Sequence, residues 1–170
     1  ALHMMPYLTS IGLERPNAAL AVSIFAIVSI PTRILYGISA DIFQKKYVMA
    51  LSLGLTVVAQ VILGLLDGSS FALVVVFTVV HGFAAGGAMP TRAPMIREYF
   101  GVNNFGTIYG LLGVFLMIGV VIGAPIAGWV YDTRGVYDPI WFVYAGLNII
   151  AMILILVLPK ASGKTSPVVS

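Results

Sequence analysis

Five apolar runs, each about as long as a bilayer-spanning helix, dominate this sequence. They cover 18–40, 47–66, 71–90, 109–130 and 140–158, and each has about 19 to 23 residues, where a helix needs about 20 to cross the hydrocarbon core of a bilayer. Apolar residues make up 60% of the chain and charged residues 9%, whereas a soluble domain averages about 25% charged residues. The sequence therefore predicts an all-α integral membrane protein.

A shorter apolar segment, 1–12, precedes these runs and is interpreted as the end of a further helix. With their flanking turns, the expected helices form one bundle over 1–159, and they cover 1–12 (partial), 18–40, 47–66, 71–96, 105–131 and 139–158. Asn17 is expected to cap the second helix, and the polar tail 160–170 is expected to be disordered. The chain opens inside an apolar segment without Met, which suggests a piece of a longer protein.

The cations predict the orientation of the helices. The net charge is +3, but the basic residues lie between apolar runs and form no patch for nucleic acid. One side of the membrane would hold Lys45, Lys46, Arg92, Arg97, Lys160 and Lys164, and the other only Arg15 and Arg134. By the positive-inside rule, the first side, with the C-terminus, is cytoplasmic. We expect a multi-pass protein of the cell (inner) membrane.

Arg33 is the residue that most needs an explanation. It precedes Asp41 by 8 residues, or roughly 12 Å of helix, and therefore lies near the midplane if Asp41 marks the membrane surface. An arginine at this depth either extends its side chain to the surface or faces a bundle interior and serves function. The expected spans contain no Asp or Glu to pair with it. Because a guanidinium matches a carboxylate in two parallel hydrogen bonds, a small organic anion is the leading candidate ligand.

Two histidines and one turn are the other candidate sites. His81 lies about 15 Å deep in its run, where it bonds a neighbouring helix, contacts a substrate or takes up a proton; His3, in the first segment, raises the same question. The second candidate is the turn after Arg33, in which Gly37, Asp41, Lys45 and Lys46 would act as a gating element. Asp41 at a helix C-terminus needs nearby cations, although the turn could also be an ordinary solvated one.

Small residues predict which helices lie inside the bundle. G-x-x-x-G spacings occur at Gly82 and Gly86, at Gly106 and Gly110, and at Gly119 and Gly123, and such spacings let helix backbones approach closely. The third and fourth runs are therefore expected inside, and the uncharged runs 47–66 and 140–158 are expected to face lipid. In addition, Gly37-x-x-x-Asp41 recurs as Gly128-x-x-x-Asp132 three helices later, which would fit an inverted repeat of three helices.

The motifs of membrane enzymes are a poor fit to this sequence. Gly37-Ile-Ser39-Ala40 comes close to the G-x-S-G of an intramembrane serine protease, but its helix is expected to end soon afterwards. The sequence has no Cys, no H-E-x-x-H and no acidic metal cluster. We therefore expect no enzyme, no cofactor and no metal site, and favour binding and translocation.

Several stretches of the sequence resemble a known family. The stretch from Gly37 to Lys46, GISADIFQKK, resembles the G-x-x-x-D-x-x-G-[RK]-[RK] signature of the major facilitator superfamily, with Gln44 in place of Gly. Other stretches look like the monocarboxylate and oxalate–formate antiporter branch, and they are His3–Thr9, Pro31–Arg33, Glu98–Gly101, Phe105–Thr107 and Gly128–Asp132. The resemblance covers 1 to about 159.

The resemblance implies that this is the C-terminal half of a twelve-helix transporter, from the end of helix 7 to helix 12. Helices 7, 8, 10 and 11 of such proteins line the cavity, and the arginine of helix 8, here Arg33, binds the substrate carboxylate. Two departures limit the comparison. Oxalate carriers add a lysine in helix 11, which 105–131 lacks, and animal monocarboxylate carriers have an aspartate where Ser29 stands.

Taken together, the sequence predicts a secondary active transporter, symporter or antiporter, that moves a small organic anion, with a monocarboxylate as the first candidate, by alternating access. Arg33, His81 and His3 would contact substrate. Its partners would be the anion, membrane lipid and an N-terminal six-helix half of the same protein. The alternatives are a membrane sensor or assembly protein that does not transport, and an efflux transporter for uncharged small molecules.

Overall fold

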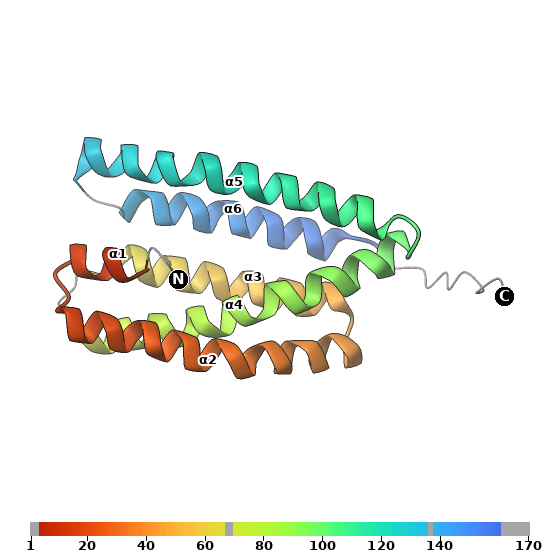
Figure 1. The fold of residues 1–170 in the computed structure, drawn as a ribbon, viewed down its shortest axis with the longest axis horizontal. Coiled ribbons are helices and arrows are strands. Elements are labelled where there is room, and N and C mark those ends of the chain that lie inside the picture. The colour runs from red at the N-terminus through yellow and green to blue at the C-terminus, as the bar shows by residue number, and fades with distance from the viewer. Residues whose placement is uncertain (1–3, 67–69, 136–137, 161–170) are drawn as a thin grey trace.

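A computed structural model describes residues 4–66, 70–135 and 138–160, which form six α-helices (Figure 1). The helices are α1 (Met4–Ser10), α2 (Arg15–Ile42), α3 (Lys45–Gly64), α4 (Phe71–Phe100), α5 (Phe105–Arg134) and α6 (Asp138–Val157). In this part of the chain there is no strand, and all helices except α1 are long and apolar enough to cross a membrane. The expected all-α membrane fold is confirmed.

Helix α2 begins before the residue that was expected to cap it. Its first residue is Arg15, its N-cap is Glu14, and no side chain caps its free N–H groups. Asn17 therefore lies inside the first turn, and the prediction that it caps the helix is wrong. The physical reason is Pro16, whose fixed φ and missing N–H suit the first helical positions and draw the start of the helix forward.

The main packing runs through α4 and α3. Helix α4 packs along α2 and along α3, and α3 also packs along α6 (Figure 1). A buried cluster at one end joins α1 to these helices, with Leu8 and Ala59 fully buried and Val74 beside them. Helix α3, expected to face lipid, thus has neighbours on two sides and presents only its remaining face, with Leu51 and Val58, outward.

Glycines of α4 bring three helices close together. A Cβ placed on Gly86 would lie 2.7 Å from Thr32 Cβ, and one on Gly87 would lie 2.7 Å from both Ser52 Cβ and the Tyr36 ring. Such approaches are shorter than any real carbon–carbon contact, so only glycine fits at these two positions. The prediction that α4 is an interior helix is correct.

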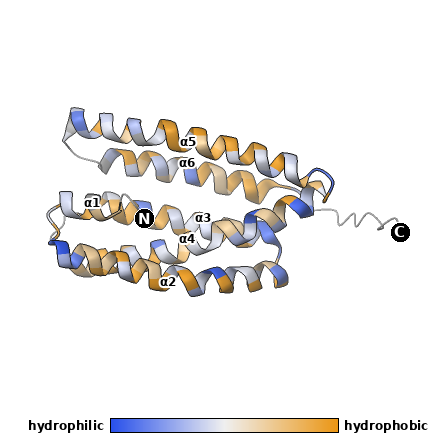
Figure 2. Cartoon of the chain, in the orientation of Figure 1, coloured by the Kyte–Doolittle hydropathy of each residue, from blue (hydrophilic) through white to orange (hydrophobic). Residues whose placement is uncertain are grey.

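Helix α5 corresponds to the fourth apolar run, which was also expected inside the bundle, but its surroundings differ from that prediction. None of its residues whose exposure is described is buried, although hydrophobic residues recur along the helix (Figure 2). A Cβ on Gly106, Gly110, Gly113 or Gly119 would meet nothing within 4 Å. The expectation that these glycines lie inside the bundle is therefore not met among the described helices, because none of them packs along this face.

Polar contacts tie three helices together at one end of the bundle. Lys45 at the start of α3 forms an ion pair with Glu98 near the end of α4, with Nζ 3.0 Å from Oε2. Lys46 Nζ donates a 2.8 Å hydrogen bond to the Leu158 carbonyl, and Tyr99 Oη donates one of 2.9 Å to the Pro159 carbonyl. The basic turn after α2, the end of α4 and the end of α6 therefore lie on the same side (Figure 1).

Candidate functional site

Arg33 projects from the middle of α2. Its side chain is exposed, while the flanking Thr32 is 1% exposed and Tyr36 is 6% exposed, and both pack inward against the bundle. No acidic side chain in the described part of the chain pairs with the guanidinium. The ion pair found in this part joins Lys45 and Glu98. The expected lack of an internal counter-charge for Arg33 thus holds within the described residues, and its depth in a membrane stays a prediction.

The orientation of Arg33 follows from the helix on which it lies. Ser29, Thr32 and Tyr36 are buried against neighbouring helices, and Thr32 Oγ1 donates to the Val28 carbonyl of its own helix. Successive residues of an α-helix differ by about 100° around its axis. Because α2 is held against α4 at the close Gly86 contact, the direction of Arg33 is determined by packing on both sides of it.

His81 lies in α4 between two phenyl rings. Its imidazole stacks on Phe25 of α2 with ring centroids 5.2 Å apart, and on Phe77 of α4 with centroids 5.4 Å apart. Nδ1 is buried and has no hydrogen-bond partner, yet the residue as a whole is partly exposed. Any contact of this side chain with a solute would therefore use its other nitrogen, Nε2.

The two candidate residues do not touch one another. Phe25, on which His81 stacks, precedes Arg33 by eight residues on α2, which is roughly 12 Å along the helix axis. They would contact different levels of a cavity. His3, the third candidate, lies outside the described residues.

The turn between α2 and α3 is short and regular. Helix α2 ends at Ile42, where the Phe43 N–H donates a 2.8 Å hydrogen bond to the Ser39 carbonyl. Gln44 has φ −61° and ψ 123°, which any residue adopts, so glycine is not needed at this position. A Cβ on Gly37 would meet nothing within 4 Å, so Gly37 leaves an open surface on the last turns of α2.

The charges of this turn are arranged differently from the expectation. Asp41 is exposed and forms no ion pair within the described residues, while Lys45 and Lys46 bond Glu98 and the end of α6. The lysines thus hold α3, α4 and α6 together and do not neutralise Asp41. Sequence reasoning missed Glu98 as a site residue, although an acid at the end of α4, on the same side as the basic turn, was a usable signal.

These features define a class: a multi-pass helical membrane protein with an arginine that has no acidic partner among the described residues, halfway along a membrane-length helix, and a basic turn joining two of its helices. The chain belongs to the Major Facilitator Superfamily, whose sequence profile matches residues 2–169.

Among individual proteins, the chain is similar to monocarboxylate transporter 12 of Xenopus laevis, with 28% identity over 94% of this chain and 35% of that protein. It is also similar to monocarboxylate transporter 13 of Rattus norvegicus, with 26% identity over 88% of this chain and 35% of that protein. The MFS-type transporter SLC18B1 of Mus musculus shares 29% identity over 70% of this chain and 26% of its own length. The chain therefore spans about a third of its monocarboxylate relatives, and no solved structure gives a significant match.

Proposed function

We propose that this chain is the C-terminal half of a secondary active transporter that moves a small organic anion, with a monocarboxylate as the first candidate, by alternating access. The observation that carries the proposal is Arg33, a cation halfway along the membrane-length helix α2 without an acidic partner in the described residues. If α2 crosses a membrane, this cation lies near the midplane, where an arginine without a counter-charge is costly. A carboxylate ligand would remove that cost by two parallel hydrogen bonds.

The family and its relatives support the same proposal. Two of the similar proteins are named as monocarboxylate transporters. In the proposed mechanism Arg33 holds the carboxylate, His81 and His3 line the cavity, and Gly37, Asp41, Lys45 and Lys46 form a cytoplasmic gating turn. The protein would lie in the cell membrane with its C-terminus in the cytoplasm, and an N-terminal six-helix half would complete the pathway.

The test is uptake by the full-length protein in liposomes over a panel of mono- and dicarboxylates, with wild type compared with Arg33→Lys. Lysine keeps the charge and loses the planar pair of donors. Because a hydrogen bond to a charged group contributes about 1.5 to 3 kcal/mol, we expect uptake of the preferred monocarboxylate at low concentration to fall by roughly 10- to 100-fold.

Arg15→Lys is the matched control, since Arg15 lies at the exposed start of α2, and its uptake should equal that of wild type. Equal uptake by wild type and Arg33→Lys would remove Arg33 from the mechanism. Transport of uncharged solutes alone would contradict the anion class.

A further inference from the structure

Arg92 is a second arginine without an acidic partner in a membrane-length helix. Helix α4 continues to Phe100, so Arg92 lies inside the helix and not in the loop that follows it. The ion pair of the described residues joins Lys45 and Glu98, and these residues include no hydrogen-bond or ring partner of Arg92. The positive-inside rule accounts for the side of the membrane on which Arg92 is expected, but not for what its guanidinium contacts.

The position of Arg92 along α4 bears on its depth. Glu98, which pairs with Lys45 of the basic turn, follows Arg92 by six residues, or roughly 9 Å of helix, against about 15 Å for half of the hydrocarbon core. If the end of the bundle with this ion pair lies at the membrane surface, Arg92 lies within the hydrocarbon region. An arginine there either extends along the protein to the surface or faces a bundle interior or a wet cavity.

Arg92 lies on a face of α4 that neither α2 nor α3 covers. Gly86 lies against α2 and Gly87 against α3. At about 100° per residue, Arg92 is roughly 120° around the axis from Gly86 and roughly 140° from Gly87. Partly exposed residues follow one another at helical spacing on this face, and they are His81, Ala85, Ala88 and Arg92. Arg92 therefore shares a face of α4 with His81, which the proposed function places in the transport cavity.

A cavity of about 210 Å³ lies beside Arg92. It is formed by α3, α4, α5 and α6, at the end of the bundle where α3 and α5 begin and α4 and α6 end (Figure 1). Met49, Leu112 and Ile155 contribute apolar walls from α3, α5 and α6, and the hydroxyl of Tyr99 is used on a carbonyl that follows α6. Because Arg92 lines a space among four helices, its side chain does not run along the outside of the bundle. We call this space the Arg92 cavity.

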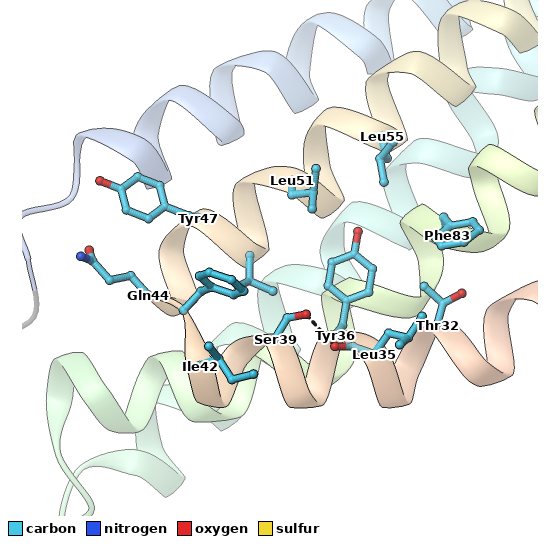
Figure 3. A pocket seen from close by; sticks show the side chains of 12 residues that line it. Thr32, Leu35, Tyr36, Ser39, Ile42, Gln44, Tyr47, Leu51, Leu55 and Phe83 are labelled. Atoms are coloured by element: carbon cyan, nitrogen blue, oxygen red, sulfur yellow. Dashed lines mark hydrogen bonds between the residues drawn. The ribbon is translucent and has the colours of Figure 1, made fainter.

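A larger cavity of the described chain has a different lining. It measures about 660 Å³ and lies between α2 and α3, where Figure 3 shows Tyr36 of α2 pointing toward Leu51 and Leu55 of α3. None of its lining residues is charged, so it offers no counter-charge to an anion. The Arg92 cavity, in contrast, combines one cation with apolar walls.

The charge and the size of the Arg92 cavity define a class of ligand. One guanidinium pairs with one carboxylate through two parallel hydrogen bonds, whereas a second carboxylate would lie unpaired among apolar side chains at a high cost. The volume of about 210 Å³ is smaller than that of pockets for drug-sized ligands, which measure about 300 to 1,000 Å³. A small monocarboxylate with an apolar body fits both conditions.

We propose that Arg92 and the Arg92 cavity form a second binding site for small monocarboxylates, nearer to the basic turn than Arg33. Thr32, the neighbour of Arg33, lies against Gly86, and Arg92 follows Gly86 by six residues, so the two arginines differ in depth by roughly 9 Å. An anion that leaves Arg33 toward the basic turn would then meet a second cation. The class of ligand rests on the proposed function, whereas the lack of a partner for Arg92 does not.

The test measures which arginines a carboxylate protects in the full-length protein. Phenylglyoxal reacts with free guanidinium groups, and peptide mass spectrometry reads each arginine separately. Titration with butyrate should slow the labelling of Arg92, by roughly tenfold at about ten times the half-effect concentration, because labelling follows the unoccupied fraction. Butanol, which lacks the carboxylate, should not protect Arg92, and succinate should protect it less than butyrate. Arg97, exposed on the same helix, and Arg15, exposed at the start of α2, are the internal controls, and their labelling should not change.

The same labelling in Arg33→Lys shows whether Arg92 binds the anion itself. Butyrate should still protect Arg92 in this variant, and loss of that protection would overturn the proposal, because Arg92 would then respond only through Arg33. Unchanged labelling of Arg92 in butyrate, absence of labelling under every condition, or equal protection by butanol or succinate would overturn it as well. In wild type, protection of Arg33 alone would remove the second site and leave the proposed function standing, and protection of Arg92 alone would do the reverse.

Discussion

At the scale of single residues, the candidate site contains two side chains, Arg33 and His81, that have polar atoms without a partner among the described residues. Arg33 is exposed and has no acidic partner in the described chain, and Nδ1 of His81 is buried without any partner. A buried polar atom without a hydrogen bond is costly, so His81 is retained against a cost in stability, and under the proposed function an arginine at mid-membrane depth carries a cost of its own. Such residues are the ones from which function is most often built.

The geometry of His81 gives a prediction about its usable nitrogen. In His81→Gln, the amide reaches about as far as Nε2, whereas the shorter side chain of His81→Asn places its amide near Nδ1, in the buried pocket between Phe25 and Phe77. We expect uptake by the full-length protein to stay within about threefold of wild type for Gln. For Asn we expect a loss of about tenfold, since a hydrogen bond contributes about 1 kcal/mol and an unsatisfied buried group costs more.

His81→Phe is the control for this prediction, because it keeps the aromatic stack and has no donor. It should leave the melting temperature near that of wild type and lower uptake as Asn does. If Phe transports as well as wild type, His81 is only a packing residue.

At the scale of the helices, the sequence predicted well which segments form helices and less well how these helices pack. Each apolar run of membrane length corresponds to a long helix, because a segment that crosses a bilayer must satisfy its backbone N–H and C=O groups internally, as a helix does. The start of α2 was misplaced because Pro16 outweighed the capping preference of Asn17.

The roles of α3 and α5 could not be obtained from composition. A G-x-x-x-G spacing shows that a helix can be approached closely, and Gly82 and Gly86 are so approached, but Gly106 and Gly110 have the same spacing and an open face. The pairing of Lys45 with Glu98 likewise depends on which helix ends meet. These are properties of the packing arrangement and not of any single segment.

The contact between α2 and α4 gives a second prediction. Adding a methyl group in Gly86→Ala forces a carbon to within 2.7 Å of Thr32 Cβ, and overpacking of this kind costs about 1 to 3 kcal/mol. We expect a lower melting temperature for the full-length protein in detergent. Gly146→Ala, on α6 where a Cβ meets nothing within 4 Å, should be neutral or slightly stabilising because alanine favours helix. Equal melting temperatures for the two variants would mean that α2 and α4 lie farther apart.

At the scale of the whole chain, one end of the bundle is tied and its sides are open. Lys45, Lys46 and Tyr99 connect α3, α4 and α6 through one ion pair and two carbonyl contacts. Helix α5 packs closely along none of the described helices. Its specific contacts include a hydrogen bond from the Tyr144 hydroxyl of α6 to the Gly123 carbonyl and the Arg97 guanidinium of α4 over the Phe105 ring. The chain spans about a third of its monocarboxylate relatives, and the N-terminal half of the proposed function would cover this open surface.

The ion pair between Lys45 and Glu98 gives a prediction in which exchanging the two charges should restore the stability that a single substitution removes. Lys45 and Glu98 are 25% and 32% exposed at their side chains, and partly exposed pairs contribute about 0.2 to 1 kcal/mol. Lys45→Glu should lower the melting temperature of the full-length protein at low salt, and Lys45→Glu with Glu98→Lys should restore most of it. The difference should shrink at high salt, because salt screens the charges.

Asp41→Asn serves as the comparison, since Asp41 forms no ion pair within the described residues, and its melting temperature should not change. A double variant no more stable than Lys45→Glu alone would show that the two charges act separately.

The three contacts at the tied end also limit how the protein can move. Since α3, α4 and α6 are joined at the tied end and α2 is held against α4 at Gly86, any rocking or tilting should carry these four helices as one rigid body. Displacement would instead appear at α5, the long helix outside that linkage. Spin labels attached in pairs should then report constant separations among these four helices and changing ones from them to α5, whichever solute drives the cycle.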